Sequence, residues 1–155
     1  MRPLLTIMTL SLLAFGCHSQ SRQSLVVEDK TPIVMGSSTT ESLGIETLGG
    51  VFTPLIKPGT TVPCSLAEIF STAADGQSQI MVTLFRGTNQ MSSSNHALGQ
   101  FQIVGIPSAP RGTPKVEITF TITQQQILLS ARDLTSKTDL QIQKVSGENK
   151  PVTTN

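Results

Sequence analysis

The chain has 155 residues, enough for one domain of ordinary size. Eleven basic and ten acidic residues give a formal net charge of +1. This balance excludes the strongly basic surface that would neutralise phosphates, so no nucleic acid is expected as a partner. Six Phe with neither Tyr nor Trp also argue against a platform on which single-stranded bases could stack.

The beginning of the chain is typical of an export signal. Arg2 is a minimal basic start, and residues 4–15 form an apolar run without a charge. Such a run is too short to cross a bilayer, which takes roughly 20 helical residues, but it suits the core of a secretory signal.

The apolar run ends in Leu13-Ala14-Phe15-Gly16-Cys17, which resembles a bacterial lipobox. We therefore expect residues 1–16 to be a lipoprotein signal peptide and Cys17 to carry the lipid. The alternative is an ordinary signal peptide whose cleavage site happens to lie near a cysteine. Because His18 stands where retention at the inner membrane usually requires Asp, resemblance to sorted lipoproteins implies the outer membrane of a bacterial envelope, facing the periplasm or the cell surface.

The two cysteines predict no disulfide if Cys17 is lipidated. Cys64 is then a lone thiol in an oxidising compartment. No His or Asp is placed in the sequence to activate it, so we interpret Cys64 as a small, partly buried side chain after Pro63 rather than as a nucleophile.

Composition divides the exported part into three segments. Residues 17–42 are rich in Ser, Thr and Gln, and we expect a flexible tether there because this composition buries little apolar surface. Residues 43–145 alternate short apolar runs with turn residues, which predicts an all-β sandwich of two small antiparallel sheets. Residues 146–155 are polar and are expected to be a disordered tail.

The clearest strand lies around residues 116–122, where Val116, Ile118, Phe120 and Ile122 share one face and polar residues share the other. Around residues 80–85 both faces are largely apolar, which requires cover on two sides or a ligand on one. Further strands are predicted at residues 43–48, 51–56, 68–72, 98–106, 127–132 and 139–144. Gly49-Gly50 predicts a tight turn, and three prolines in residues 107–114 predict a loop.

No motif in the sequence indicates catalysis. There is no phosphate-binding loop, and two His with one remaining Cys cannot complete a four-ligand zinc site. The serines at 92–94 beside His96 could suggest a nucleophile but fit a loop tip better. We expect no enzyme activity, no metal and no cofactor.

From Ser42 onward many short motifs resemble, in order, the substrate-binding β-domain of the DnaK-type, 70-kDa heat-shock chaperones. These motifs are Ser42-Leu43-Gly44-Ile45-Glu46-Thr47-Leu48-Gly49-Gly50-Val51, Leu55-Ile56, Gly59-Thr60-Thr61-Val62-Pro63, Phe70-Ser71-Thr72-Ala73, Asp75-Gly76-Gln77, Leu98-Gly99-Gln100-Phe101, Gly105-Ile106, Ala109-Pro110-Arg111-Gly112, Val116-Glu117-Ile118-Thr119-Phe120, Ile127-Leu128 and Ser130-Ala131-Arg132-Asp133. The resemblance covers about two-thirds of the chain. It implies a β-sandwich whose loops frame a channel for an extended segment rich in Leu or Ile.

The resemblance also implies which residues line that channel. They are Ile45, Thr47, Leu48, Phe70, Ser71, Ala73, Ile80 and Val82. Leu48 and Ala73 would arch over the bound backbone, and Ile80 would form the floor of the pocket. The alternative is that these residues are simply the core of a sandwich.

The sequence departs from the family pattern in several places. We expect no ATPase domain before the β-domain and no helical lid after it, and therefore an activity that is independent of ATP; whether a separate ATPase partner exists is unknown. Asp75 and Arg111 match residues that meet the lid in the family. Leu48 replaces a common Met, and the turn at residues 123–126 replaces an Asp/Asn-Gly turn, which leaves the register of that hairpin open.

Three hypotheses of function follow. The first is a lipid-tethered holdase that binds extended hydrophobic peptides of unfolded or exported proteins. The second is a structural or adhesive envelope lipoprotein that kept the sandwich and lost the channel. The third is a degenerate fragment without a selected function. The first is favoured because the proposed channel positions carry no charge.

The lipid anchor is tested directly at Cys17. We expect Cys17→Ser to remove metabolic labelling with palmitate and to leave the protein soluble or unprocessed, because two or three acyl chains anchor at about 0.8 kcal/mol per buried CH₂. Cys64→Ser is the matched control and should keep the label. Unchanged labelling and membrane fractionation of Cys17→Ser would contradict the lipoprotein prediction.

Overall fold

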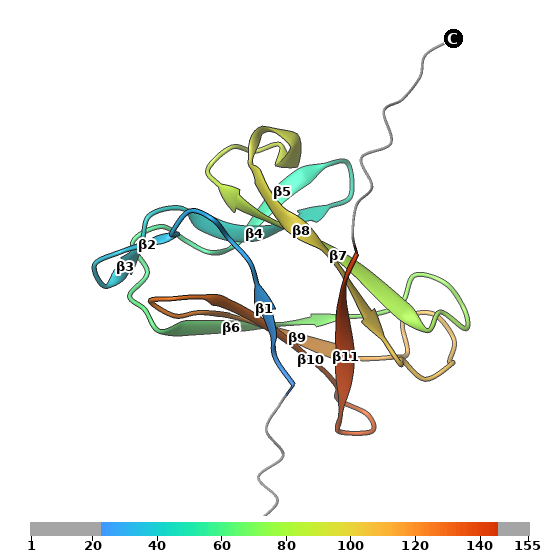
Figure 1. Cartoon of the computed structure of the whole chain (residues 1–155). Helices are drawn as coiled ribbons and strands as arrows, with labels where there is room; N and C mark the ends of the chain where they lie inside the picture. The colour runs from blue at the N-terminus through green and yellow to red at the C-terminus, as the bar shows by residue number, and fades with distance from the viewer. Residues whose placement is uncertain (1–22, 146–155) are drawn as a thin grey trace, which may run out of the picture.

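The computed structural model describes residues 23–145 as an all-β fold in two layers (Figure 1). Its elements are β1 (Leu25–Val27), β2 (Val34–Met35), β3 (Ser38–Thr39), β4 (Ser42–Thr47), β5 (Val51–Ile56), β6 (Cys64–Phe70), β7 (Gln79–Gly87), the 3₁₀ turn η1 (Ser92–Ser94), β8 (His96–Val104), β9 (Val116–Ile122), β10 (Ile127–Asp133) and β11 (Thr138–Val145). The predicted all-β class is confirmed, and no α-helix occurs between residues 23 and 145.

The two predicted sheets are joined through one strand. One layer has the order β5-β4-β7-β8 and the other the order β10-β9-β6, with β11 between β8 and β10. Leu140 of β11 pairs with Ala131 of β10, whereas the next residue, Gln141, pairs with Val104 of β8. The sandwich is therefore a single antiparallel ladder, and its two end strands are β5 and β6.

The core forms where the sequence alternates most regularly. Val116, Ile118, Phe120 and Ile122 of β9 are all completely buried. Ile127 and the alternate residues after it on β10 face the same interior, in register with β9. Each such side chain contributes about 1.5–3 kcal/mol by leaving water, so this hairpin provides much of the hydrophobic stabilisation.

Two turns that the sequence singled out have defined geometry. Gly49 and Gly50 both have positive φ, 86° and 73°, as a tight hairpin turn requires. In the β9–β10 hairpin, the Thr123 N–H donates to the Gln126 carbonyl at 2.9 Å. Ile122 then pairs with Ile127, so the unusual turn leaves the faces of β10 unchanged.

One strand lies earlier in the sequence than predicted. Instead of residues 68–72, β6 covers Cys64–Phe70, and Thr72 is a buried part of the following loop. As an end strand with Ser65, Ala67 and Glu68 among its exposed residues, β6 has no strong apolar alternation by which its start could be recognised.

The flexible tether predicted for residues 17–42 is wrong for residues 25–42. Strand β1 pairs with the first half of β10, and Val27 and Ile33 are 2% and 5% exposed within the core. Strands β2 and β3 form a small hairpin that returns the chain to β4. The few apolar residues of this stretch are enough to hold it in place, because Val27 and Ile33 pack against the core of the sandwich.

A buried ion pair fastens this N-terminal stretch to the sandwich. The Arg86 Nε of β7 lies 3.0 Å from Asp29 Oδ2, and both side chains are about one-tenth exposed. Arg86 Nη1 also donates to Glu41 Oε2 at 3.0 Å, where the Glu41 side chain is 40% exposed. One guanidinium of β7 therefore holds both ends of the segment that runs from β1 to β4.

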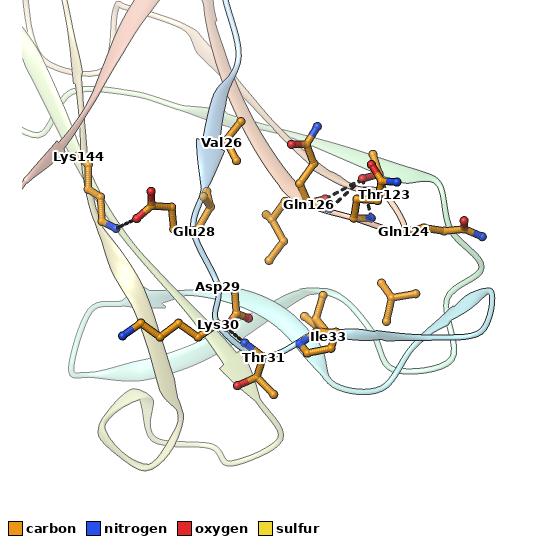
Figure 2. A pocket seen from close by; sticks show the side chains of 15 residues that line it. Val26, Glu28, Asp29, Lys30, Thr31, Ile33, Thr123, Gln124, Gln126 and Lys144 are labelled. Atoms are coloured by element: carbon orange, nitrogen blue, oxygen red, sulfur yellow. Dashed lines mark hydrogen bonds and ion pairs between the residues drawn. The ribbon is translucent and has the colours of Figure 1, made fainter.

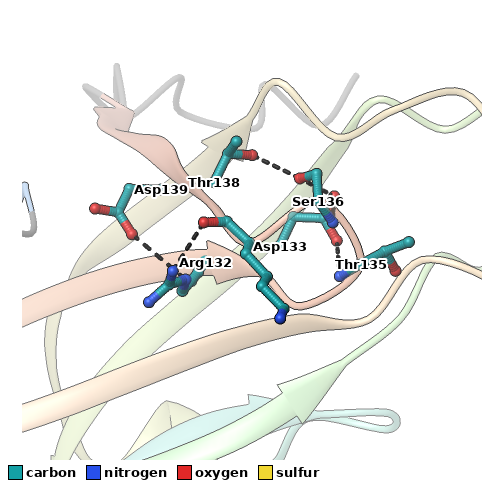
Figure 3. A network of polar contacts seen from close by, with 7 residues as sticks. Arg132, Asp133, Thr135, Ser136, Thr138 and Asp139 are labelled. Carbon is teal, nitrogen blue, oxygen red and sulfur yellow. Dashed lines mark hydrogen bonds and ion pairs between the residues drawn. The ribbon is translucent and has the colours of Figure 1, made fainter.

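The turn between β10 and β11 is closed by a buried carboxylate (Figure 3). Asp133 accepts hydrogen bonds from the Thr135 N–H at 2.9 Å and from Ser136 Oγ at 2.7 Å. Burial alone would raise the pKa of Asp133, but the hydrogen bonds from Ser136 and Thr135 outweigh it and hold this pKa below its ordinary value. Arg132 donates to the Lys137 carbonyl at 2.8 Å, in a turn where Lys137 has a φ of 59°.

Some sequence predictions fall outside the described residues. They are the signal peptide at residues 1–16, lipidation of Cys17, the tether at residues 17–22 and the tail at residues 146–155. Among residues 23–145 no helix has the length and apolarity needed to cross a membrane.

The ion pair of Asp29 makes a testable contribution to stability. Asp29→Ala leaves the buried guanidinium of Arg86 with a single, half-exposed partner, so we expect the free energy of unfolding in urea to fall by about 3 kcal/mol. Glu41→Ala removes the exposed partner of the same arginine and should cost less than about 1 kcal/mol. Equal losses for the two variants would contradict the importance given to the buried pair.

Candidate functional site

Inside the ladder, the first half of β7 is open on one side. Strand β7 pairs with β8 from Gln79 to Arg86, but its pairing with β4 runs only from Leu84 to Gly87. Within the described residues, the backbone of residues 80–83 therefore has no strand partner on the side toward β4. Unpaired N–H and C=O groups at such an edge can accept an added extended chain.

The tight turn after β4 lies on one side of this open edge. The β4–β7 register, if continued beyond Ile45, would set Thr47 opposite Val82. Leu48, the next residue, is fully exposed although it is apolar. An exposed leucine beside free backbone groups is a feature that a ligand could cover.

The loop of residues 71–78 leads into β7 on the other side. Gln77 shapes it, because its Oε1 accepts hydrogen bonds from the N–H groups of Ala73 and Ala74 at 2.9 and 3.2 Å, and its Nε2 donates to the Gln79 carbonyl at 2.6 Å. Ser71 Oγ donates to the Pro114 carbonyl at 2.6 Å. The loop therefore has a fixed shape although Ser71 and Ala73 are exposed.

An outer loop supports this inner loop. The Arg111 N–H donates to Asp75 Oδ1 at 2.8 Å, and the Gly112 N–H donates to the Thr72 carbonyl at 3.0 Å. The Gly76 N–H donates to the Ala109 carbonyl at 2.9 Å. The proline-containing loop at residues 107–114 thus stabilises the loop of residues 71–78 through these hydrogen bonds.

A second outer loop supports the turn that carries Leu48. Ser92, only 2% exposed, directs its hydroxyl toward the Glu46 carboxylate and the Gly50 carbonyl. The Ser92 N–H donates to the Gly50 carbonyl at 2.9 Å, and the Phe52 N–H donates to the Gln90 carbonyl at 2.8 Å. The serines that could be mistaken for nucleophiles therefore include a structural hydrogen-bonding residue.

The structure separates the residues expected to line the channel into two groups. Ile45, Ile80 and Val82 are 5–7% exposed and belong to the hydrophobic core, and Phe70 is half-buried against it. The exposed group is Thr47, Leu48, Ser71 and Ala73. Ile80 and Val82 lie on the open half of β7, Thr47 and Leu48 lie where β4 turns into β5, and Ser71 and Ala73 belong to the loop that leads into β7. Ile45 and Phe70 both line a cleft between β5 and β6.

Sequence reasoning missed a cleft between the two end strands. Its volume is about 390 Å³, and it includes Ile45 and Phe70 from the expected set. The other lining residues are Thr53, Pro54 and Leu55 of β5 and Leu66, Glu68 and Ile69 of β6. The position of this cleft depends on which strands end the ladder, and this cannot be read from neighbouring residues. The one local indication is Pro54, because proline is largely confined to edge strands.

A second cleft, of about 520 Å³, lies beside the N-terminal stretch (Figure 2). Residues 26–34 form one side, and the β9–β10 turn with Lys144 forms another. Lys144 Nζ is 3.9 Å from Glu28 Oε2, an exposed ion pair of small energetic weight. Sequence reasoning could not predict this cleft, because residues 26–34, which form one of its walls, were expected to be a flexible tether.

Few groups in the described region have unusual electrostatics. Burial raises the pKa of the Cys64 thiol, only partly opposed by a backbone hydrogen bond with Ile122. The thiol is thus less acidic than a free cysteine and a poorer nucleophile. No cluster of His, Cys, Asp and Glu suited to a metal ion occurs among residues 23–145.

These features define an antiparallel β-sandwich with an unpaired strand edge between two hydrogen-bonded loops. Comparison with known proteins identifies the family. Residues 11–153 match the family model of the Hsp70 protein, and 111 residues are 50% identical to heat shock protein hsp-6 of Caenorhabditis elegans. That alignment covers 71% of this chain and 17% of the nematode protein. The chain belongs to the Hsp70 family, which confirms the resemblance found in its motifs.

Ser92 provides a test of how the turn near Leu48 is supported. We expect Ser92→Ala to lower the free energy of unfolding by about 1–3 kcal/mol, because it leaves buried acceptors on Glu46 and Gly50 without their donor. Amide hydrogen exchange at residues 48–50 should accelerate. Ser93→Ala, at the exposed neighbouring serine, should change neither quantity, and an equal effect of both substitutions would contradict this role.

Proposed function

We propose that the domain binds extended apolar segments of unfolded or exported proteins and acts as a holdase without ATP. The observation that supports this most is the unpaired edge of β7 at residues 80–83, with apolar side chains beneath it and exposed Leu48 beside it. Membership of the Hsp70 family is consistent with a chaperone-like substrate-binding domain.

In this proposal each group of residues has a separate task. The free N–H and C=O groups of β7 pair with the backbone of the bound segment. Ile45, Ile80 and Val82 provide the apolar floor, with Phe70 as its wall. Thr47, Leu48, Ser71 and Ala73 form the rim, where Leu48 and Ala73 close over the bound backbone.

The energetics predict weak binding. One buried Leu contributes about 1.5–3 kcal/mol, and each main-chain hydrogen bond adds roughly 1 kcal/mol. The cost of association, on the order of 4–15 kcal/mol, opposes these terms. We therefore expect micromolar or weaker affinity and rapid release, properties that suit transient holding of a client.

We further propose that lipidated Cys17 places the domain at the bacterial outer membrane. The motif at residues 13–17 is the support for this location. An anchored holdase would meet exported chains before they fold.

One observation favours the second candidate, a structural envelope lipoprotein. Ile45, Ile80 and Val82 belong to the core cluster, as they would in a sandwich that has lost its channel. The two candidates differ in whether an exposed rim residue affects peptide binding.

Leu48→Ser separates these candidates. Titration of the purified chain with a labelled Leu-rich heptapeptide should give about tenfold weaker binding for this variant, because the contact of one leucine is lost. Its thermal midpoint should match that of the wild type, since Leu48 is fully exposed. Met35→Ser, at a 78% exposed methionine of β2, is the matched control and should bind normally.

Adding ATP to the same titration should leave the affinity unchanged. An ATP-dependent shift would contradict the nucleotide-independent activity. Absence of binding to the wild type would favour the structural lipoprotein.

A further inference from the structure

The cleft between β5 and β6 is bounded by the two ends of the strand ladder. Strand β6 pairs with β9 along Cys64–Phe70, and no other described strand pairs with it. Strand β5 pairs with β4 and contains Pro54, which has no N–H to offer. Of the two edges, β6 therefore has the complete row of main-chain donors and acceptors.

The β6 edge has few of the features that usually block strand addition, since Glu68 is its one charged residue. It contains no Pro, no Lys and no Gly, and Ile69 is 60% exposed. A seven-residue edge strand of this kind is a template for an incoming extended chain.

The lining of the cleft indicates the side chains of its partner. Leu55, Leu66 and Phe70 are partly buried apolar walls. Glu68 is exposed and is the one charged residue among those that line the cleft. In the described part of the chain its carboxylate has neither an ion pair nor a hydrogen bond. An apolar wall beside a free carboxylate matches a Lys or Arg side chain, whose stem is apolar and whose end is cationic.

From these features we infer a second polypeptide-binding site at the β6 edge. The site takes an extended segment that pairs with the β6 backbone and places a Lys or Arg against Glu68. It is separate from the β7 edge, although Ile45 and Phe70 line the cleft and also belong to the set proposed for the β7 site. Because different backbone edges are used, either site can exist without the other.

The test uses the full chain, labelled with ¹⁵N, and two ten-residue peptides rich in Val and Thr that differ only in a central Lys or Glu. At low salt we expect the Lys peptide to bind about threefold more tightly, the size of effect typical of an exposed ion pair. Amide shifts should concentrate on residues 64–70. The preference should disappear near 1 M salt, where the Debye length is about 3 Å.

Substitutions identify the carboxylate responsible. Glu68→Gln should abolish the preference for the Lys peptide, and Glu68→Lys should reverse it. Glu117→Gln is the matched control: Glu117 lies opposite Ile69 in the β6–β9 register, between the buried residues Val116 and Ile118, so it faces away from the core. This variant should keep the full preference.

Leu48→Ser distinguishes this site from the β7 edge, because it should weaken the Leu-rich heptapeptide and leave the Lys peptide unaffected. Shifts confined to residues 47–50 and 71–83 would overturn the proposal, as would equal binding of the two peptides. Sedimentation showing that the β6 edge is occupied by a second copy of this chain would also overturn it.

Discussion

The architecture depends on the change of partner within β11. Leu140 completes the pairing with β10, and Gln141 begins the pairing with β8. Because this change occurs between adjacent residues, β11 joins the β5-β4-β7-β8 layer to the β10-β9-β6 layer without a break in strand pairing. The remaining interruption lies between β5 and β6, so the position of the cleft there follows from the way β11 closes the opposite side.

The open edge of β7 has a comparable origin in strand pairing. β4 and β7 remain in register only as far as Ile45 and Leu84. Beyond that point both chains lead into supported loops, one held through Ser92 and the other through Gln77 and the outer loop at residues 105–114. Thus the loops keep their shapes although the strands between them do not complete the ladder.

Sequence reasoning could predict those parts of the fold that depend on local alternation. Phe120 and its neighbours on β9 have an unambiguous period of two, and Gly49-Gly50 requires the left-handed backbone that a tight turn provides. It failed for residues 25–42, because Val27 and Ile33 are buried by a surface assembled from distant strands. Family resemblance proposed Leu48 and Ile80 as site residues, and that assignment stays a prediction. Sequence reasoning did not single out Glu68, because its place in the cleft depends on strand order rather than on neighbours in the chain.

The route by which the chain enters the sandwich has a mechanical consequence. A pull applied ahead of Leu25 first loads β1, whose ladder with β10 has three residue pairs. If that ladder opens, the next point of resistance is the contact of Asp29 with Arg86 on β7, which passes the force into the layer opposite β10. The N-terminal stretch can therefore yield in two stages, first by opening the three-pair ladder with β10 and then by breaking the buried contact with Arg86.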